Sequence, residues 1–230
     1  MVNIDTVYQR VLALANKEQR GYITPQEFNL FANQAQMDIF EQYFYDINQF
    51  GRLPGNDTEY SDMLNYLEEK IHFYEVEKSV SINRTKTFYN LGAGTDPYRI
   101  GSISYNNSTC EQVNAKDIIT INNSPLTKPT VSRPIYVLKN NYKIYIYPQE
   151  VTDEILVNYI RKPKKVNWTY VVVGGKPLVN TGSTSGYQDF ELHPSEETKL
   201  VIKILGLAGI TLKDPALYQA AAVEDNKNIQ

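Results

Sequence analysis

The sequence has little of the chemistry that most catalytic and metal sites use. Its 230 residues include one cysteine, Cys110, and two histidines, His72 and His193, which lie far apart. A single cysteine excludes an intrachain disulfide framework and a cysteine-rich metal site. Zinc ligands usually come in close pairs, so a buried or capping histidine is the better interpretation of each histidine.

A long apolar run and a strong net charge are also missing. The longest near-apolar run, residues 200–212, contains Lys203 and is shorter than the roughly 20 residues of a membrane span. Charges begin at Asp5 and no apolar signal core precedes them, so we expect no membrane association. The net charge of −3 argues against a protein that coats itself with nucleic acid, but not against one past which nucleic acid moves.

The composition is that of a globular protein that is rich in tyrosine. Hydrophobic residues make up 42% and charged residues 21%, which allows a packed core, and the length suits one or two domains. There are 18 tyrosines and one tryptophan. Tyrosine suits half-buried sheets and protein interfaces equally well, so both interpretations stay open.

The first third of the sequence predicts helices. A short helix is expected over residues 5–16, and the best-marked helix follows Thr24. Thr24 is the expected N-cap, and Pro25 occupies the first helical position. Glu27, three residues after Thr24, completes a capping box with it. The apolar residues of this helix form a broad stripe that needs cover on more than one side. A third helix is expected over residues 58–77.

From Ser79 the apolar pattern changes to a period of two, which indicates strands. Early strands are expected over residues 79–89, 98–107 and 116–123. An antiparallel meander is expected over 135–139, 142–147 and 154–161, with a tight turn at Asn140–Asn141. One more strand is expected over 168–173, followed by a polar, glycine-rich loop over 174–186.

The last part of the sequence is helical again and contains the most enzyme-like cluster. Ser195 is a good N-cap, and Glu196 and Glu197 fall in the first turn, where the helix dipole favours anions. With His193 they resemble a metal or acid/base site, but a zinc-protease motif needs two histidines four residues apart. We therefore interpret the cluster as a helix entry, and we expect no catalytic residue, no cofactor and no metal.

Two segments are candidates for an assembly interface. One is the basic cluster around Pro163, formed by Arg161, Lys162, Lys164 and Lys165, which is either a solvated strand end or a contact for phosphate or an acidic partner. The other is a last short helix that begins at Asp214–Pro215, with the apolar residues Leu217, Tyr218 and Val223.

Together these patterns predict an α+β fold. Residues 1–78 and 192–230 are expected to form one helical bundle. Residues 79–191 are expected to form an antiparallel β-sheet or a small β-barrel, inserted into that bundle. The two ends of the chain are thus expected to share one domain.

Beside these patterns, three stretches of the sequence resemble a known protein family. They are NKEQRGYITPQEFNLFANQAQMDIFEQYF, the middle RPIYVLKNNYKIYIYPQE with VNYIRKPKK, and the late FELHPSEETKLVIKILGLAGI with DPALYQAAA. They resemble head-to-tail connectors, or ring adaptors, of tailed bacteriophages, and in particular the ring proteins of crAss-like phages and the tail tubular protein A type. The resemblance spans nearly the whole chain in the same order.

The resemblance implies a non-enzymatic virion protein at the head–tail junction, assembled in the host cytoplasm. It implies a ring of about twelve copies that contacts the portal protein and neighbouring tail or ring proteins. Genomic DNA would cross the central channel without sequence-specific binding. One alternative is a virion or surface binding module that recognises protein or glycan through its tyrosine-rich β domain. Another is an enzyme that uses His193 with Glu196 or Glu197.

The segment after Asp214 generates a first prediction. A short capped helix with a polar end, placed after the core is complete, is free to contact a neighbouring subunit or the portal. Deletion of the residues after Asp214 should therefore spare folding, measured by thermal unfolding, and impair assembly, measured by electron microscopy. Unimpaired assembly of the truncated chain would refute this role.

Overall fold

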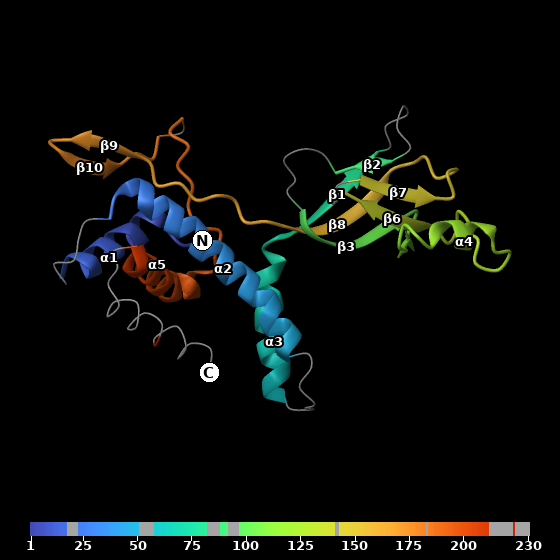
Figure 1. Cartoon of the computed structure of the whole chain (residues 1–230), viewed down its shortest axis with the longest axis horizontal. Coiled ribbons are helices and arrows are strands. Elements are labelled where there is room, and N and C mark those ends of the chain that lie inside the picture. Colours follow the sequence, from blue (N-terminus) through green and yellow to red (C-terminus); the bar gives the residue numbers. More distant parts are fainter. Residues whose placement is uncertain are drawn as a thin grey trace. The chain divides into compact units, whose positions relative to one another are not determined.

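The structure is a computed structural model, and it has an α+β fold with two compact units (Figure 1). The helical unit comprises Met1–Lys70 and Pro163–Gln230, and the β unit comprises Ile71–Lys162. The residues that the structure describes are 1–17, 23–50, 58–81, 88–91, 97–140, 143–182, 184–211 and 223.

The unit boundaries differ from those expected at residues 78 and 191. Residues 71–78 lie in the β unit because the third helix stops early and strand β1 begins at Glu75. Residues 163–191 lie in the helical unit because hydrogen bonds, described below, tie this segment to a helix. The helical unit therefore also contains a β-hairpin.

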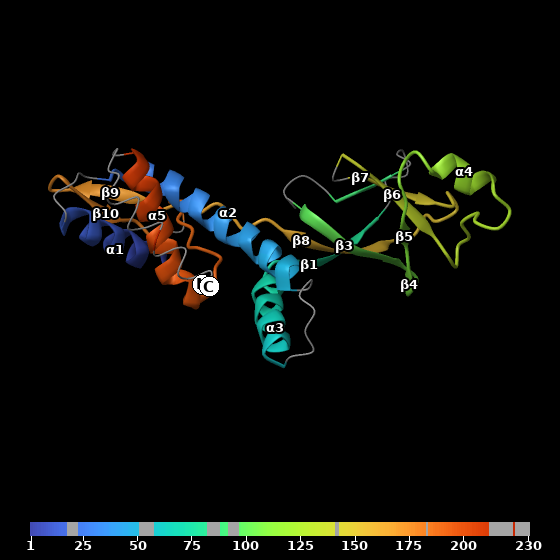
Figure 2. The same cartoon turned by 60° about the horizontal axis from the view of Figure 1, so that its bottom comes forward.

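The helical unit is built on α1 (Ile4–Lys17), α2 (Pro25–Phe50) and α5 (Glu197–Thr211). α5 packs against both α1 and α2, as Figure 2 shows. The capping box of α2 is confirmed. The Thr24 N–H donates to Glu27 Oε2 at 2.9 Å, and the Glu27 N–H donates to Thr24 Oγ1 at 3.3 Å. These bonds lower the pKa of the Glu27 carboxyl group.

Helix α3 (Thr58–His72) ends five residues before the expected position. An ion pair ties it to Glu196, the residue before α5: Lys70 Nζ contacts Glu196 Oε1, and their side chains are 10% and 8% exposed. The Lys70 ammonium also lies 4.2 Å from the centre of the Tyr66 ring. Breaking such a buried pair on one side is costly, because the remaining charge stays buried.

Side-chain amides of α2 hold an extended segment of the chain. Asn29 accepts from the Trp168 N–H at 2.8 Å and donates to the Trp168 carbonyl at 3.1 Å. Asn33 does the same for Val166, at 3.0 and 2.9 Å. We name these two residues and Gln36 the amide ladder. The ladder takes the place of a neighbouring β-strand for residues 164–168.

Gln36 makes the third contact and extends the ladder to a second segment. Its Nε2 donates to the Lys164 carbonyl at 2.8 Å, and its Oε1 accepts from the Glu191 N–H at 3.0 Å. The Glu191 carboxylate accepts from the Lys164 N–H at 2.8 Å. Gln36 and Glu191 are buried, so these bonds offset the cost of removing their polar groups from water.

The ladder works because two regular spacings match. Four residues of an α-helix rise about 6 Å, and two residues of an extended strand rise about 6.6 Å. The segment runs antiparallel to α2. The side-chain amide of Asn29 therefore meets the backbone of Trp168, and that of Asn33, one turn later, meets the backbone of Val166. The last helical step, from Asn33 to Gln36, rises only about 4.5 Å, and we infer that the longer glutamine side chain covers the difference.

The β unit contains two open sheets, so among the described strands there is no closed barrel. One sheet is antiparallel and has the order β1 (Glu75–Val80), β8 (Ile155–Arg161), β3 (Pro97–Tyr105), β4 (Ser108–Thr109). The other has the order β2 (Tyr89–Asn90), β7 (Lys143–Tyr147), β6 (Ile135–Lys139), β5 (Glu111–Gln112). Residues from both sheets form one hydrophobic core.

Two strand predictions for the β unit are wrong. Residues 116–123 contain helix α4 (Ile118–Asn123) instead of a strand. β5 and β6 pair in parallel, so the chain between them must cross over, and α4 lies in that crossover. The expected meander is also broken, because β8 pairs with β1 and β3 and not with β7. The β6–β7 hairpin is confirmed, and Asn140 in its turn has a φ of +52°.

Many tyrosines are part of the interior. In the β unit Tyr74, Tyr89, Tyr105, Tyr136 and Tyr159 are buried. The Tyr89 hydroxyl donates to the carbonyls of Asp153 at 2.8 Å and Val151 at 3.2 Å. Burial raises the pKa of Tyr89 to about 12, so the phenol stays a neutral donor at physiological pH. Here tyrosine supplies apolar bulk and a hydrogen bond at once.

The amide ladder generates a stability prediction. Asn33→Ala removes the partners of the Val166 N–H and carbonyl, and Val166 is buried. The free energy of unfolding should fall by about 2–4 kcal/mol, since an unsatisfied buried group costs about 1–3 kcal/mol. Chemical denaturation measures the loss.

Gln34→Ala is the matched control, because Gln34 is exposed on the same helix and bonds only to Asp38 within it. Both substitutions introduce a better helix former, so a propensity gain does not separate them. The control should change stability by no more than about 0.5 kcal/mol. Equal stability of the two variants would contradict the ladder's role.

Candidate functional site

The side chains of the histidine cluster near residue 193 make capping and ion-pair contacts. His193 itself caps the short helix η1 (Pro194–Glu196), since its Nδ1 accepts from the Ser195 N–H at 3.3 Å. The expected N-cap, Ser195, is therefore wrong by two residues. Glu196 pairs with Lys70, and Glu197 pairs with Arg10 at 2.9 Å. Across the part of the chain that the structure describes, no group of three or more His, Cys, Asp or Glu residues is placed to hold a metal ion.

The basic cluster is divided between the two units. Arg161 and Lys162 belong to the β unit, and Lys164 and Lys165 to the helical unit. The Arg161 guanidinium lies 5.8 Å from the centre of the Tyr74 ring. Lys164 Nζ lies 3.8 Å from Glu191 Oε1 while its side chain is largely exposed. An assembly role for these four residues stays a prediction.

The other predicted interface residues are only partly described. Leu217 and Tyr218, with the expected helix from Asp214, lie outside the described residues. Val223 is described, and its side chain is exposed. Its exposure is compatible with the assembly role expected for it, which stays a prediction.

One exposed apolar feature of the helical unit is the hairpin of β9 (Tyr170–Val173) and β10 (Lys176–Val179). Gly174 and Gly175 form its turn with φ angles of +59° and +79°, a conformation that glycine adopts without strain. Side chains of Val171, Val172, Val173 and Leu178 are 45%, 66%, 58% and 51% exposed. In Figure 1 the hairpin stands apart from the helices.

The base of the hairpin is fixed firmly. Trp168 is 1% exposed, and its Nε1 donates to Asp5 Oδ1 at 2.9 Å. The Trp168 ring packs against the ring of Tyr8. It also stacks with the ring of Tyr170, which is the first residue of β9. The amide ladder holds the backbone of Trp168. The hairpin therefore leaves the helical unit in a defined direction, although a lone two-stranded hairpin is marginally stable in water.

A second apolar feature of the same unit is a groove between α1 and α5. Its volume is about 370 Å³. Ala13 and Leu14 line it from α1, and Val201, Ile202 and Leu205 from α5. Arg10 and Thr198 complete the lining, and Arg10 is held by its ion pair with Glu197. Its apolar lining suits an apolar side chain or strand of a partner.

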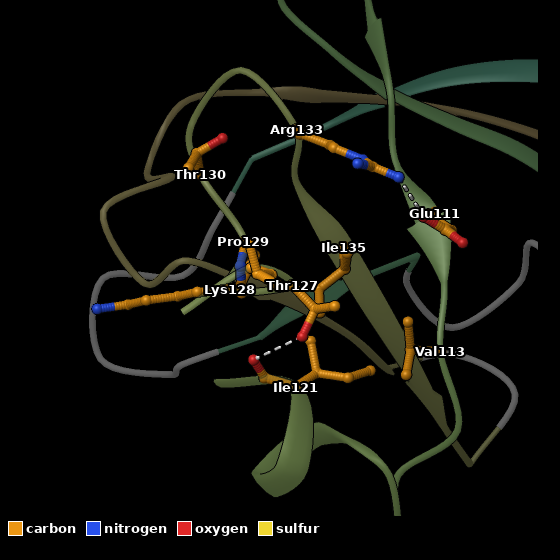
Figure 3. A pocket seen from close by; sticks show the side chains of 10 residues that line it. Glu111, Val113, Ile121, Thr127, Lys128, Pro129, Thr130, Arg133 and Ile135 are labelled. Carbon is orange, nitrogen blue, oxygen red and sulfur yellow. Dashed lines mark hydrogen bonds and ion pairs between the residues drawn. The ribbon is translucent and has the colours of Figure 1, made fainter. Parts of the chain in front are cut away.

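The β unit contains a pocket of about 370 Å³ beside β5 and α4 (Figure 3). Apolar side chains of Val113, Ile121 and Ile135 lie on one side of it. Arg133 Nη2 lies 3.7 Å from Glu111 Oε2. This mixture of one ion pair and apolar side chains suits a protein contact. Leu126, which also lines the pocket, is 95% exposed.

The sequence interpretation missed the hairpin and the groove. Two glycines between apolar runs signal a tight hairpin turn, and VVVGGKPLV fits that signal. The polar residues after Val179 led to the expectation of a loop instead. The groove has no such local signal, because its two walls are nearly 190 residues apart (13 to 201).

Within the described helices, none is both long enough and apolar enough to cross a membrane. No family model matches the chain, and no curated protein matches it.

Proposed function

We propose that the protein is a non-enzymatic structural component of a tailed-phage virion, a ring-forming adaptor between the portal vertex and the tail. In this role the chain binds copies of itself, the portal protein and a tail or ring protein, and genomic DNA passes through the ring. The observation that carries the proposal is the exposed β9–β10 hairpin on its fixed base.

Exposed aliphatic side chains on a fixed support favour an assembly role for physical reasons. Contiguous exposed apolar patches are unusual on monomers and mark interaction sites. The four aliphatic side chains of the hairpin gain free energy when a partner covers them, by about 25 cal/mol per Å² of apolar surface. Because the base is fixed by the ladder and Trp168, little ordering entropy opposes that contact.

The alternative function, recognition of glycan through a tyrosine-rich β domain, receives less support. Five tyrosines of the β unit are buried in its interior, where they cannot stack on a sugar. Tyr98 on β3 is exposed, whereas Ile100, two residues further along the same strand, packs against the core. Packing thus accounts for these five tyrosines of the β unit.

Assembly of the purified chain tests the proposal. The full chain, alone or with its portal protein, should form rings in negative-stain images and multimers in mass photometry. Replacing residues 171–178 by a short Gly-Ser link should abolish rings. It should change the unfolding temperature by no more than about 2–4 °C, which corresponds to about 1 kcal/mol, because these side chains are outside the core.

Ile119→Asp is the control, since it alters an apolar side chain that is 70% exposed, lies in the β unit and does not line the pocket of that unit. We expect this variant to form rings as the unaltered chain does. A chain that stays monomeric with and without the portal protein, and is missing from virions by mass spectrometry, would overturn the proposed function.

A further inference from the structure

The outer face of the sheet that contains β6 and β7 carries two lysines side by side. On β7, Ile144 and Ile146 belong to the hydrophobic core, so the alternate residues Lys143 and Tyr145 lie on the outer face. Lys139 of β6 is directly opposite Lys143, and residues opposite each other share a face. We name Lys139 and Lys143 the lysine pair.

Aromatic rings hold both ammonium groups of the lysine pair. Lys139 Nζ lies 4.7 Å from the centre of the Tyr145 ring, and Lys143 Nζ lies 5.0 Å from the centre of the Phe88 ring. The centres of these two rings are 5.5 Å apart. A cation–π contact attracts an ammonium group to the ring but leaves its charge in place. The rings therefore position two positive charges without neutralising them.

No carboxylate compensates the lysine pair within the described residues. The contacts of both ammonium groups are with rings, and neither group forms an ion pair with a described Asp or Glu side chain. Like charges directly opposite each other in an antiparallel pair are destabilising. An anion that contacts both ammonium groups removes this repulsion. The lysine pair therefore offers two positioned, uncompensated charges to an anion.

The charge of the whole β unit has the same sign. Ile71–Lys162 contain 11 Lys and Arg residues and 8 Asp and Glu residues, a net charge of +3. The helical unit contains 12 Lys and Arg residues and 18 Asp and Glu residues, a net charge of −6. The chain's small net charge thus combines two units of opposite sign. A polyanion is attracted to the β unit and repelled by the helical unit.

Phosphate groups suit the lysine pair better than unpaired bases do. Proteins bind unpaired bases by stacking them on aromatic rings, whereas here ammonium groups lie over the rings of Tyr145 and Phe88. Duplex DNA presents a continuous line of phosphates, with about one negative charge per 1.7 Å of its axis. We propose that the lysine pair contacts the phosphate backbone of duplex DNA, whatever its sequence. This inference rests on the proposed ring function and assigns its DNA contact to the β unit.

The expected contact is weak, as a ring past which DNA moves requires. Each neutralised phosphate contributes about −0.9 to the slope of log affinity against log salt concentration. One copy supplies only two lysines, so its salt dependence is shallow and its binding loose. The contact is therefore compatible with passage of DNA.

Salt-dependent DNA binding of the full chain tests the proposal. The affinity for a labelled duplex, measured by fluorescence anisotropy between about 50 and 200 mM salt, should fall as salt rises. Lys139→Gln and Lys143→Gln should each make the slope shallower by about one, and the double variant by about two. Absence of binding at the lowest salt, or an unchanged slope in the double variant, would overturn the contact.

Arg99→Gln is the matched control. Arg99 is exposed on β3, in the other sheet of the same unit, and its replacement changes the net charge by the same amount. Because the two sheets pack on one core, their outer faces point in opposite directions. The control should keep the slope of the unaltered chain, and all variants should keep its unfolding temperature. A loss of slope in Arg99→Gln equal to that in Lys139→Gln would show a general charge effect and contradict the site.

Two other polyanions check the identity of the partner. Single-stranded DNA should bind with a shallower slope than the duplex, because fewer counterions are released per phosphate. Polyglutamate should bind more weakly than the duplex. Tighter binding of single strands would indicate stacking of bases and overturn the assignment to duplex DNA. Equal binding of polyglutamate would overturn nucleic acid as the partner.

The outcomes separate this contact from the proposed function, because ring formation is scored independently by electron microscopy. Rings with DNA binding that requires the lysine pair support both. Rings whose DNA binding does not require the pair overturn the contact and leave the adaptor function standing. Binding through the pair by a chain that never forms rings supports the contact and contradicts the ring function. A chain with neither rings nor DNA binding contradicts both.

Discussion

The hydrogen bonds of the amide ladder are the constraint on which the arrangement of the helical unit depends. Asn29, Asn33 and Gln36 replace a neighbouring strand for residues 164–168. Without them, the backbone groups of the buried residues Val166 and Trp168 would have to find other partners or remain unsatisfied, which proteins rarely tolerate. The ladder thereby turns the chain that leaves the β unit into a fixed part of the helical unit.

The position of the hairpin follows from this attachment. Trp168 ends the laddered segment, and its indole is fixed by Asp5 and Tyr8. Two residues later β9 begins, so the exposed strands start from a buried support. A rigid support with an exposed apolar end is what a subunit contact requires, because little ordering opposes binding. The proposed adaptor function therefore depends on a polar network that itself touches no partner.

Sequence patterns predicted the features that depend on neighbouring residues. The α+β class, the capping box at Thr24 and the β6–β7 hairpin are local, and the structure has them. The ladder was not predictable in this way, because its acceptors lie 128 to 139 residues away. On the sequence, Asn29 and Asn33 look like ordinary polar positions of an amphipathic helix. Helix α4 was missed for a related reason, since the parallel pairing of β5 and β6 that requires a crossover is itself long-range.

The central claim is that side chains of α2 bind the backbone of residues 164–168. Hydrogen exchange of individual backbone amides, followed by NMR, tests it most directly. The amides of Val166 and Trp168 should exchange slowly, on the time scale of the α2 helix amides, because opening them requires separation of the segment from the helix. Exchange of these two amides at the rate of an unstructured peptide, with the α2 amides still protected, would contradict the account.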